Sequence, residues 1–201
     1  DLWNLTPNDS TSILRAHKSI ERAADNRLAF TGDDGDRVRV NPRSTTRLMV
    51  VPRPLSAMET ALSPAIGPVP ASFFDLALLA RFSAEKLRIR PGGVYLYLRE
   101  VRGHLEARLW NELFDFLEER TALPRGVFRA TVMMDNLAAV LEADEVLFEL
   151  MHHSAGLSLD PQAYAADHVA LFNAPDRPIL PAREHIGLNA KFLRSVSLMT
   201  I

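Results

Sequence analysis

The feature that most constrains the fold is residues 123–157, where a turn, an apolar strand, an acid and a helix follow one another. Leu123-Pro-Arg-Gly126 has the composition of a turn, and residues 127–134 are apolar enough for a buried strand. Asp135 ends this strand, and residues 137–151 have the apolar spacing of a helix. This order is typical of barrel enzymes, which carry their chemistry at the carboxyl ends of the strands.

Strand and helix alternate through the rest of the second half. Residues 94–98 are an apolar strand, and residues 104–120 place leucines and phenylalanines on one helix face. Residues 165–172 fit either state, and residues 190–201 fit a helix. Strands joined through helices predict parallel βα units, and therefore an α/β fold of the TIM (β/α)8-barrel type. Only part of such a barrel is expected here, since a complete one takes about 250 residues; the alternative is an open sheet.

The first half carries weaker signals. Its predicted elements are a strand over residues 1–5, a helix over 12–24 capped by Asn8, Asp9 or Ser10, a hairpin over 27–40, a strand over 48–51 and a helix over 72–87. Residues 52–71 are rich in proline and predict an irregular loop. We therefore treat residues 1–201 as a single domain, with the hairpin 27–40 and the loop 52–71 as insertions.

Composition excludes several classes of function. The chain has no cysteine, which rules out disulfides and thiolate chemistry within these residues. A formal net charge of −2 gives no electrostatic reason to expect nucleic acid as a partner. No apolar run approaches the roughly 18 residues that a membrane helix needs. The expectation is a soluble, cytoplasmic protein with no membrane partner.

Many ordered segments of the chain resemble the malate synthase family. They are residues 93–98, His104-Leu-Glu-Ala-Arg-Leu-Trp-Asn111, Leu123-Pro-Arg-Gly126, Arg129-Ala-Thr-Val132, residues 142–150 and His153-Ser-Ala-Gly-Leu157, with Ser72-Phe-Phe-Asp75, Ile179-Leu-Pro181 and Phe192-Leu-Arg-Ser195 at the two ends. The resemblance covers the front half or so of the family's barrel. It implies an acyltransferase of the glyoxylate cycle that condenses acetyl-CoA with glyoxylate to malate and CoA, using Mg²⁺.

The resemblance also implies functional positions, several of which are altered. The family's first metal ligand, a glutamate, falls on Asp135. Its second, an aspartate, falls on Ala163, so Asp160 is the candidate substitute. The catalytic arginine falls on Val51, which leaves Arg53 as the candidate electrophile. The aspartate base of the family lies further along than this sequence reaches.

Other charged residues have structural interpretations. Glu142, Glu145 and Glu149 share one helix face and predict a solvated acidic surface rather than a metal cluster. His152 and His153 follow that helix and favour capping or core packing. A carboxylate at the end of a buried strand is costly without a metal, an arginine or a backbone partner, so Asp135 is the strongest candidate.

Three hypotheses for the function follow. The first is a working acyltransferase, with metal at Asp135 and Asp160 and with Arg53 as electrophile. The second is a catalytically inactive homologue with a regulatory or assembly role, suggested by Val51 and Ala163. The third is a related enzyme that forms or cleaves other acyl-CoA or 2-oxo acid C–C bonds. This segment alone is expected to be inactive, and either a homo-oligomer or the rest of a longer chain is expected to cover its strand edges.

Overall fold

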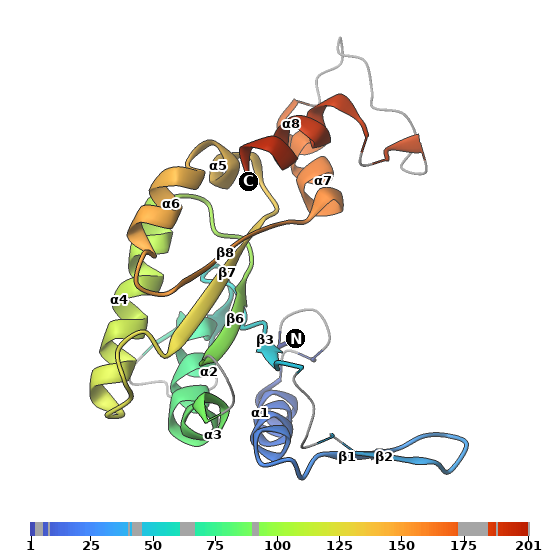
Figure 1. Cartoon of the computed structure of the whole chain (residues 1–201), viewed down its shortest axis with the longest axis vertical. Helices are drawn as coiled ribbons and strands as arrows, with labels where there is room; N and C mark the ends of the chain where they lie inside the picture. Colours follow the sequence, from blue (N-terminus) through green and yellow to red (C-terminus); the bar gives the residue numbers. More distant parts are fainter. Residues whose placement is uncertain are drawn as a thin grey trace. The chain divides into compact units, whose positions relative to one another are not determined.

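The protein is an α/β chain, represented here by a computed structural model (Figure 1). The structure describes residues 1–2, 6–7, 9–39, 41, 46–60, 67–89, 93–172, 185–187 and 189–200. Its main strand pairs are parallel: β3 (Met49–Val50) pairs with β6 (Val94–Leu98), and β7 (Phe128–Met134) pairs with β8 (Ser154–Leu159). The chain divides into two compact units: unit 1 is Asp1–Tyr97 with Leu113–Arg129, and unit 2 is Leu98–Glu112 with Ala130–Ile201.

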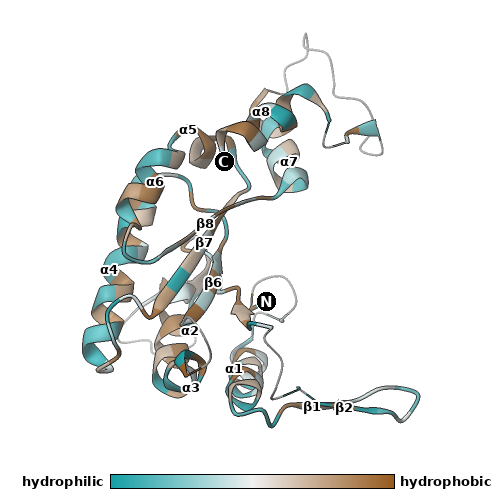
Figure 2. Cartoon of the chain, viewed as in Figure 1, coloured by the Kyte–Doolittle hydropathy of each residue, from teal (hydrophilic) through white to brown (hydrophobic). Residues whose placement is uncertain are grey.

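Helices form the core of unit 1. They are α1 (Ser10–Ala24), α2 (Ala71–Leu79), the π-helical turn η1 (Ala80–Ala84), α3 (Glu85–Arg88) and the second half of α4 (His104–Arg120). Asp9 caps α1, because its carboxylate accepts a hydrogen bond from the Ser12 N–H at 2.9 Å. Helix α2 is coloured mainly as hydrophobic in Figure 2, and its Leu76 and Leu79 are fully buried with Ile13 of α1.

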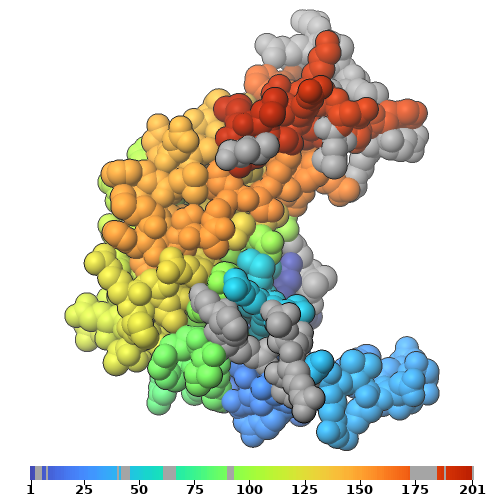
Figure 3. Space-filling model, in the orientation of Figure 1, coloured from blue at the N-terminus to red at the C-terminus, as the bar shows by residue number. Residues whose placement is uncertain are grey.

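The strands of unit 1 are short. They are β1 (Ala29–Thr31) with β2 (Arg37–Arg39), β3 (Met49–Val50) with β6 (Val94–Leu98), and β4 (Met58–Glu59) with β5 (Val69–Pro70). The β3–β6 pair is parallel, and the other two pairs are antiparallel. The β1–β2 hairpin projects from α1 as a narrow arm (Figure 3), and its Phe30 and Val38 are exposed. The predicted hairpin and the predicted strand near residue 50 are therefore present.

A buried carboxylate holds the turn that leads into β7 (Phe128–Met134). Glu118 on α4 accepts hydrogen bonds from the backbone N–H groups of Gly126 at 2.8 Å and Phe128 at 3.1 Å. Because the Glu118 side chain is buried, water could not take its place as the acceptor for these two N–H groups. The turn expected at residues 123–126 is thus anchored to the helix before it.

Unit 2 contains the βα units expected from the sequence. Residues 130–134 of β7 pair in parallel with β8 (Ser154–Leu159), and the register shifts between Ala130 and Thr131. The helices that follow these strands are α5 (Leu137–Leu141), α6 (Ala143–Glu149), α7 (Pro161–Phe172) and α8 (Lys191–Met199). On α7 and α8, the His168 and Phe192 rings stack with their centroids 5.3 Å apart.

The parallel βα prediction is confirmed, with local differences. The helix predicted over residues 137–151 is broken at Glu142 into α5 and α6, and the one over residues 72–87 contains η1. Residues 165–172 are helical, and the strand β8 was not predicted. None of the described helices has the length and apolar character needed to cross a bilayer. Residues 3–5 of the predicted first strand, Asn8 and Ile179-Leu-Pro181 lie outside the described residues.

Candidate functional site

Two acids follow adjacent parallel strands of unit 2. Asp135 comes directly after β7, and Asp160 comes directly after β8. The register pairs Met134 with Leu159, and the Asp160 N–H donates to the Met134 carbonyl at 3.4 Å. Neighbouring strands lie about 4.8 Å apart, so the two residues start from the same edge of the sheet. The structure therefore brings together the two residues that the sequence analysis proposed as metal ligands.

Protein donors surround the Asp135 carboxylate. One oxygen accepts from the Glu100 backbone N–H at 2.9 Å, and the other accepts from the Asn136 side-chain amide at 2.9 Å. Only 6% of Asp135 is exposed, and burial raises its pKa above the ordinary value, which these hydrogen bonds only partly offset. The buried carboxylate at the strand end therefore has the backbone hydrogen-bond partner that the sequence led us to expect. A raised pKa in such a place also suits proton exchange.

The backbone of Glu100 is unusual. This residue follows β6 and has a φ of 56°, in the left-handed region that residues other than glycine seldom adopt. Its N–H donates to Asp135 from this conformation. Strained backbone of this kind tends to cluster at functional sites. No local sequence pattern predicts the left-handed conformation of Glu100.

Asp160 has two tasks. Its Oδ2 accepts from Arg99 Nη2 at 3.0 Å, and its Oδ1 accepts from the backbone N–H groups of Gln162 at 3.2 Å and Ala163 at 3.0 Å. It is therefore both the partner of Arg99 and the cap of α7, with Pro161 at the first helical position, where proline is favoured. Both side chains are mostly buried, at 24% exposure for Arg99 and 22% for Asp160. No motif or spacing in the sequence indicated Arg99 as part of this site.

Replacing Asp160 separates these two tasks. Asp160→Ala is expected to lower the free energy of unfolding by about 1–2 kcal/mol, because α7 loses its cap. Asp160→Asn keeps an acceptor for the helix N–H groups and loses only the ion pair, so we expect a loss of about 0.5 kcal/mol. Urea unfolding of the full-length protein measures both. Equal losses in the two variants would mean that the ion pair, and not the cap, carries the stability.

Arg53 lies in unit 1, within a buried ion-pair network. Its Nη2 and Nε donate to Asp75 at 2.8 and 3.1 Å, and its Nη1 donates to Glu59 at 3.0 Å. The Arg53 N–H also donates to Asp75, and only 1% of the arginine is exposed. A guanidinium held in this way favours a structural role, because a substrate reaches it only if the network opens. The proposed electrophile role of Arg53 stays a prediction without support from this geometry.

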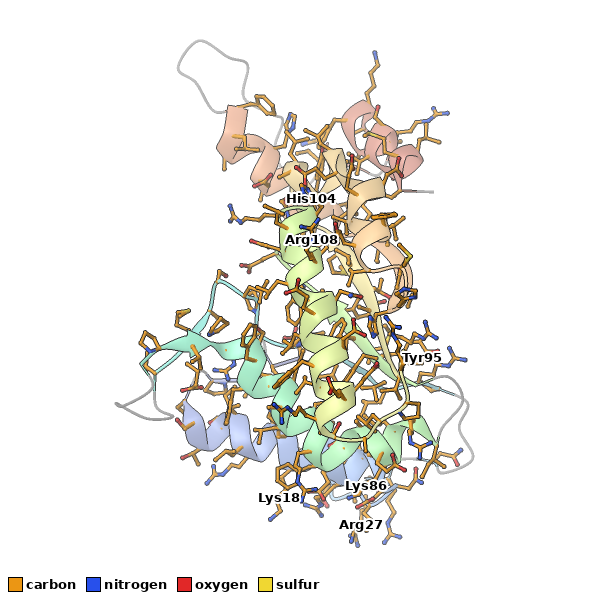
Figure 4. All side chains as sticks on the ribbon, turned by 90° about the vertical axis from the view of Figure 1, so that its left-hand side faces the viewer. Lys18, Arg27, Lys86, Tyr95, His104 and Arg108 are labelled. Carbon is orange, nitrogen blue, oxygen red and sulfur yellow. The ribbon has the colours of Figure 1, made fainter. Side chains whose placement is uncertain are left out.

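The acidic face predicted over residues 142–149 pairs with helix α4. Glu142 accepts from the His104 backbone N–H at 2.9 Å and lies 2.7 Å from His104 Nδ1, while Glu149 accepts from Arg108 at 2.6 Å. Figure 4 shows His104 and Arg108 on successive turns of α4. His153 is fully buried, with its Nδ1 2.7 Å from the Asn111 side-chain oxygen. These contacts support the structural interpretation of the group.

Comparisons with known proteins point to one family. The family described as "Malate synthase, TIM barrel domain" matches residues 47–201. Malate synthase of Myxococcus xanthus is 31% identical over 190 residues, covering 94% of this chain and 35% of the relative. Malate synthase of Arabidopsis thaliana is 31% identical over 194 residues, with 94% and 34% covered. Malate synthase A of Escherichia coli is 29% identical over 194 residues, with 96% and 36% covered. The chain spans about a third of the length of these relatives.

Proposed function

The chain belongs to the malate synthase family and carries part of its TIM barrel. We propose that it is part of a malate-synthase-like acyltransferase. The proposed reaction condenses acetyl-CoA with glyoxylate to malate and CoA, as in the glyoxylate cycle. The observation that carries this proposal is the placement of Asp135 and Asp160 at the carboxyl ends of adjacent parallel strands. Barrel enzymes build their active sites at that edge.

The residues at this edge suit parts of such chemistry. Asp135 is buried with a raised pKa, which suits a group that exchanges protons beside a substrate. Arg99 is held on one side by Asp160 and remains partly exposed. A guanidinium in that position suits the carboxylate of a small 2-oxo acid or a developing negative charge.

Release of CoA tests the proposal. The full-length protein, given acetyl-CoA and glyoxylate, is expected to release CoA thiol only when both substrates are present. Asp135→Ala is expected to slow this release by about 10²-fold, the usual effect of losing a group that transfers protons. The matched control is Asp144→Ala, which removes an exposed carboxylate from α6 of the same unit. Equal rates in the two variants would contradict the assignment of Asp135.

A second candidate is a catalytically inactive homologue with a regulatory or assembly role. Val51 and Ala163 favour it, because the resemblance calls for an arginine and a metal-binding aspartate at these positions. An uncharged side chain supplies neither a cation nor a ligand. A folded full-length protein that releases no CoA with glyoxylate would support this candidate over the first.

The remaining partners follow from the same proposal. Acetyl-CoA and glyoxylate are the proposed small-molecule partners, and a homo-oligomer or further parts of the protein are proposed to cover the strand edges. We propose the cytoplasm as the compartment, because these residues contain no cysteine and so depend on no oxidising environment. The single-domain organisation of residues 1–201 also stays a proposal.

A further inference from the structure

Asp160 has positively polarised neighbours on both of its oxygens. Arg99 Nη2 lies 3.0 Å from Oδ2, and the N-terminus of α7 donates two N–H groups to Oδ1. Mg²⁺ bound to this carboxylate at about 2.1 Å would lie within roughly 5 Å of the guanidinium. It would also face the positive end of the helix dipole, which disfavours cations. The environment of Asp160 therefore opposes a divalent cation.

The groups that hydrogen-bond to Asp135 are donors rather than further ligands. Asn136 presents its amide nitrogen to Asp135, because the amide oxygen already accepts from the Ala139 N–H at 2.9 Å and caps α5. The same nitrogen donates to the Val101 carbonyl at 2.8 Å. Mg²⁺ prefers several oxygen ligands in octahedral geometry. The Mg²⁺ that the resemblance implies thus does not fit the donor set at these two acids.

We propose that the Arg99 guanidinium is the cationic centre of this strand edge and takes the place that a divalent metal would have there. Arg99 already neutralises Asp160, and within the described part of the chain its Nε and Nη1 donate no hydrogen bond to the protein. These nitrogens suit a small carboxylate, since a guanidinium binds carboxylates through paired N–H groups. The inference rests on the proposed function, because it names the cation that this edge offers to an anionic substrate.

Titration of the metal-free full-length protein with Mg²⁺, followed by calorimetry, tests the inference. The wild type is expected to show no saturable binding in the millimolar range. Arg99→Gln removes the competing charge from Asp160 and is expected to show saturable Mg²⁺ binding in the millimolar range, at least about tenfold tighter than any weak binding by the wild type. Arg99→Lys keeps the charge and is expected to behave like the wild type.

A matched control removes a different arginine. Arg108→Gln frees Glu149 on the helical surface of the same unit, and it is expected to gain no Mg²⁺ binding. Saturable Mg²⁺ binding by the wild type that Asp160→Asn abolishes would overturn the inference. So would an Arg99→Gln variant that binds Mg²⁺ no better than the wild type.

The CoA assay, run with and without EDTA, separates this inference from the proposed function. CoA release that persists in EDTA is the expected result and supports both. Release that requires Mg²⁺ keeps the proposed function and overturns the inference. A protein that neither releases CoA nor binds Mg²⁺, while Arg99→Gln does bind it, overturns the proposed function and supports the inference.

Discussion

Asp75→Ala is expected to lower the free energy of unfolding by about 3–5 kcal/mol, because it breaks a buried ion-pair network. Asp75 accepts from two guanidinium nitrogens and the backbone N–H of Arg53, and its Oδ1 lies 3.5 Å from His17 Nε2. Without Asp75, the buried Arg53 guanidinium keeps its hydrogen bond to Glu59 but loses the carboxylate that accepts from its Nη2 and Nε. A desolvated charge that loses a partner costs far more than an exposed pair contributes.

Urea unfolding of the full-length protein measures this loss. The control is Asp33→Ala, which removes an exposed carboxylate from the β1–β2 connection and is expected to change stability by less than about 0.5 kcal/mol. Similar losses in the two variants would show that the network around Arg53 contributes little to the stability of unit 1.

The stability lost in Asp75→Ala is expected to depend on pH, in a direction that the pKa of Asp75 sets. Burial alone would raise the pKa of Asp75, but the neighbouring His17 ring and the hydrogen bonds from Arg53 outweigh burial and hold that pKa below its ordinary value. A lowered pKa in the folded state contributes stability above the unfolded pKa of about 3.9, and this contribution disappears as the pH falls through the folded value. The difference in the free energy of unfolding between the wild type and Asp75→Ala is therefore expected to be largest at neutral pH. It is expected to become smaller below about pH 4.

Gly93→Ala is the second substitution with a large expected effect, a loss of about 3–5 kcal/mol. Gly93 precedes β6 with a φ of 110°, a conformation that side chains disfavour. A Cβ atom there would lie 2.4 Å from the Val127 carbonyl oxygen, which accepts the Val94 N–H at 2.8 Å. The added methyl group must therefore push two strand ends of unit 1 apart.

Gly156→Ala is a matched control for the backbone conformation. Gly156 in β8 has a φ of 112°, and nothing lies within 4 Å of the position a Cβ would take. It is expected to cost only about 1–2 kcal/mol, the strain of the backbone alone. Urea unfolding of both full-length variants gives the comparison. A loss in Gly93→Ala no larger than in Gly156→Ala would mean that the contact with Val127 relaxes freely.

Elements with strong periodicity could be predicted from the sequence. The strand Val94–Leu98 and the helix His104–Arg120 have the predicted bounds, because regular apolar spacing and burial agree in both. The strand Ser154–Leu159 was missed, since Ser-Ala-Gly-Leu-Ser-Leu has no β-branched residue and depends on pairing with β7. The start of α7 had a local signal, because Asp160-Pro161 combines a cap with a favoured first residue.

The candidate site was predicted only as far as chain order allows. Asp135 ends a strand that the sequence predicts, whereas Asp160 was a candidate only through the family resemblance, because the strand Ser154–Leu159 before it was missed. Arg99 reaches Asp160 across 61 positions, and Arg53 reaches Asp75 across 22, and single-sequence patterns carry no record of such contacts. For the same reason, the sequence left Arg53 as a candidate electrophile when its partners are buried carboxylates.

Because the Asp160 carboxylate accepts hydrogen bonds both from Arg99 and from the N-terminus of α7, it couples two equilibria. One is the folding of the first turn of α7, and the other is the formation of the ion pair between Asp160 and Arg99. A ligand that draws Arg99 away leaves the carboxylate to the helix alone and so changes the ease with which that turn frays. Thermodynamic reciprocity then requires that fraying of the turn changes the affinity for that ligand by the same factor. Local unfolding of α7 and occupancy of the strand edge are two readouts of one coupling free energy.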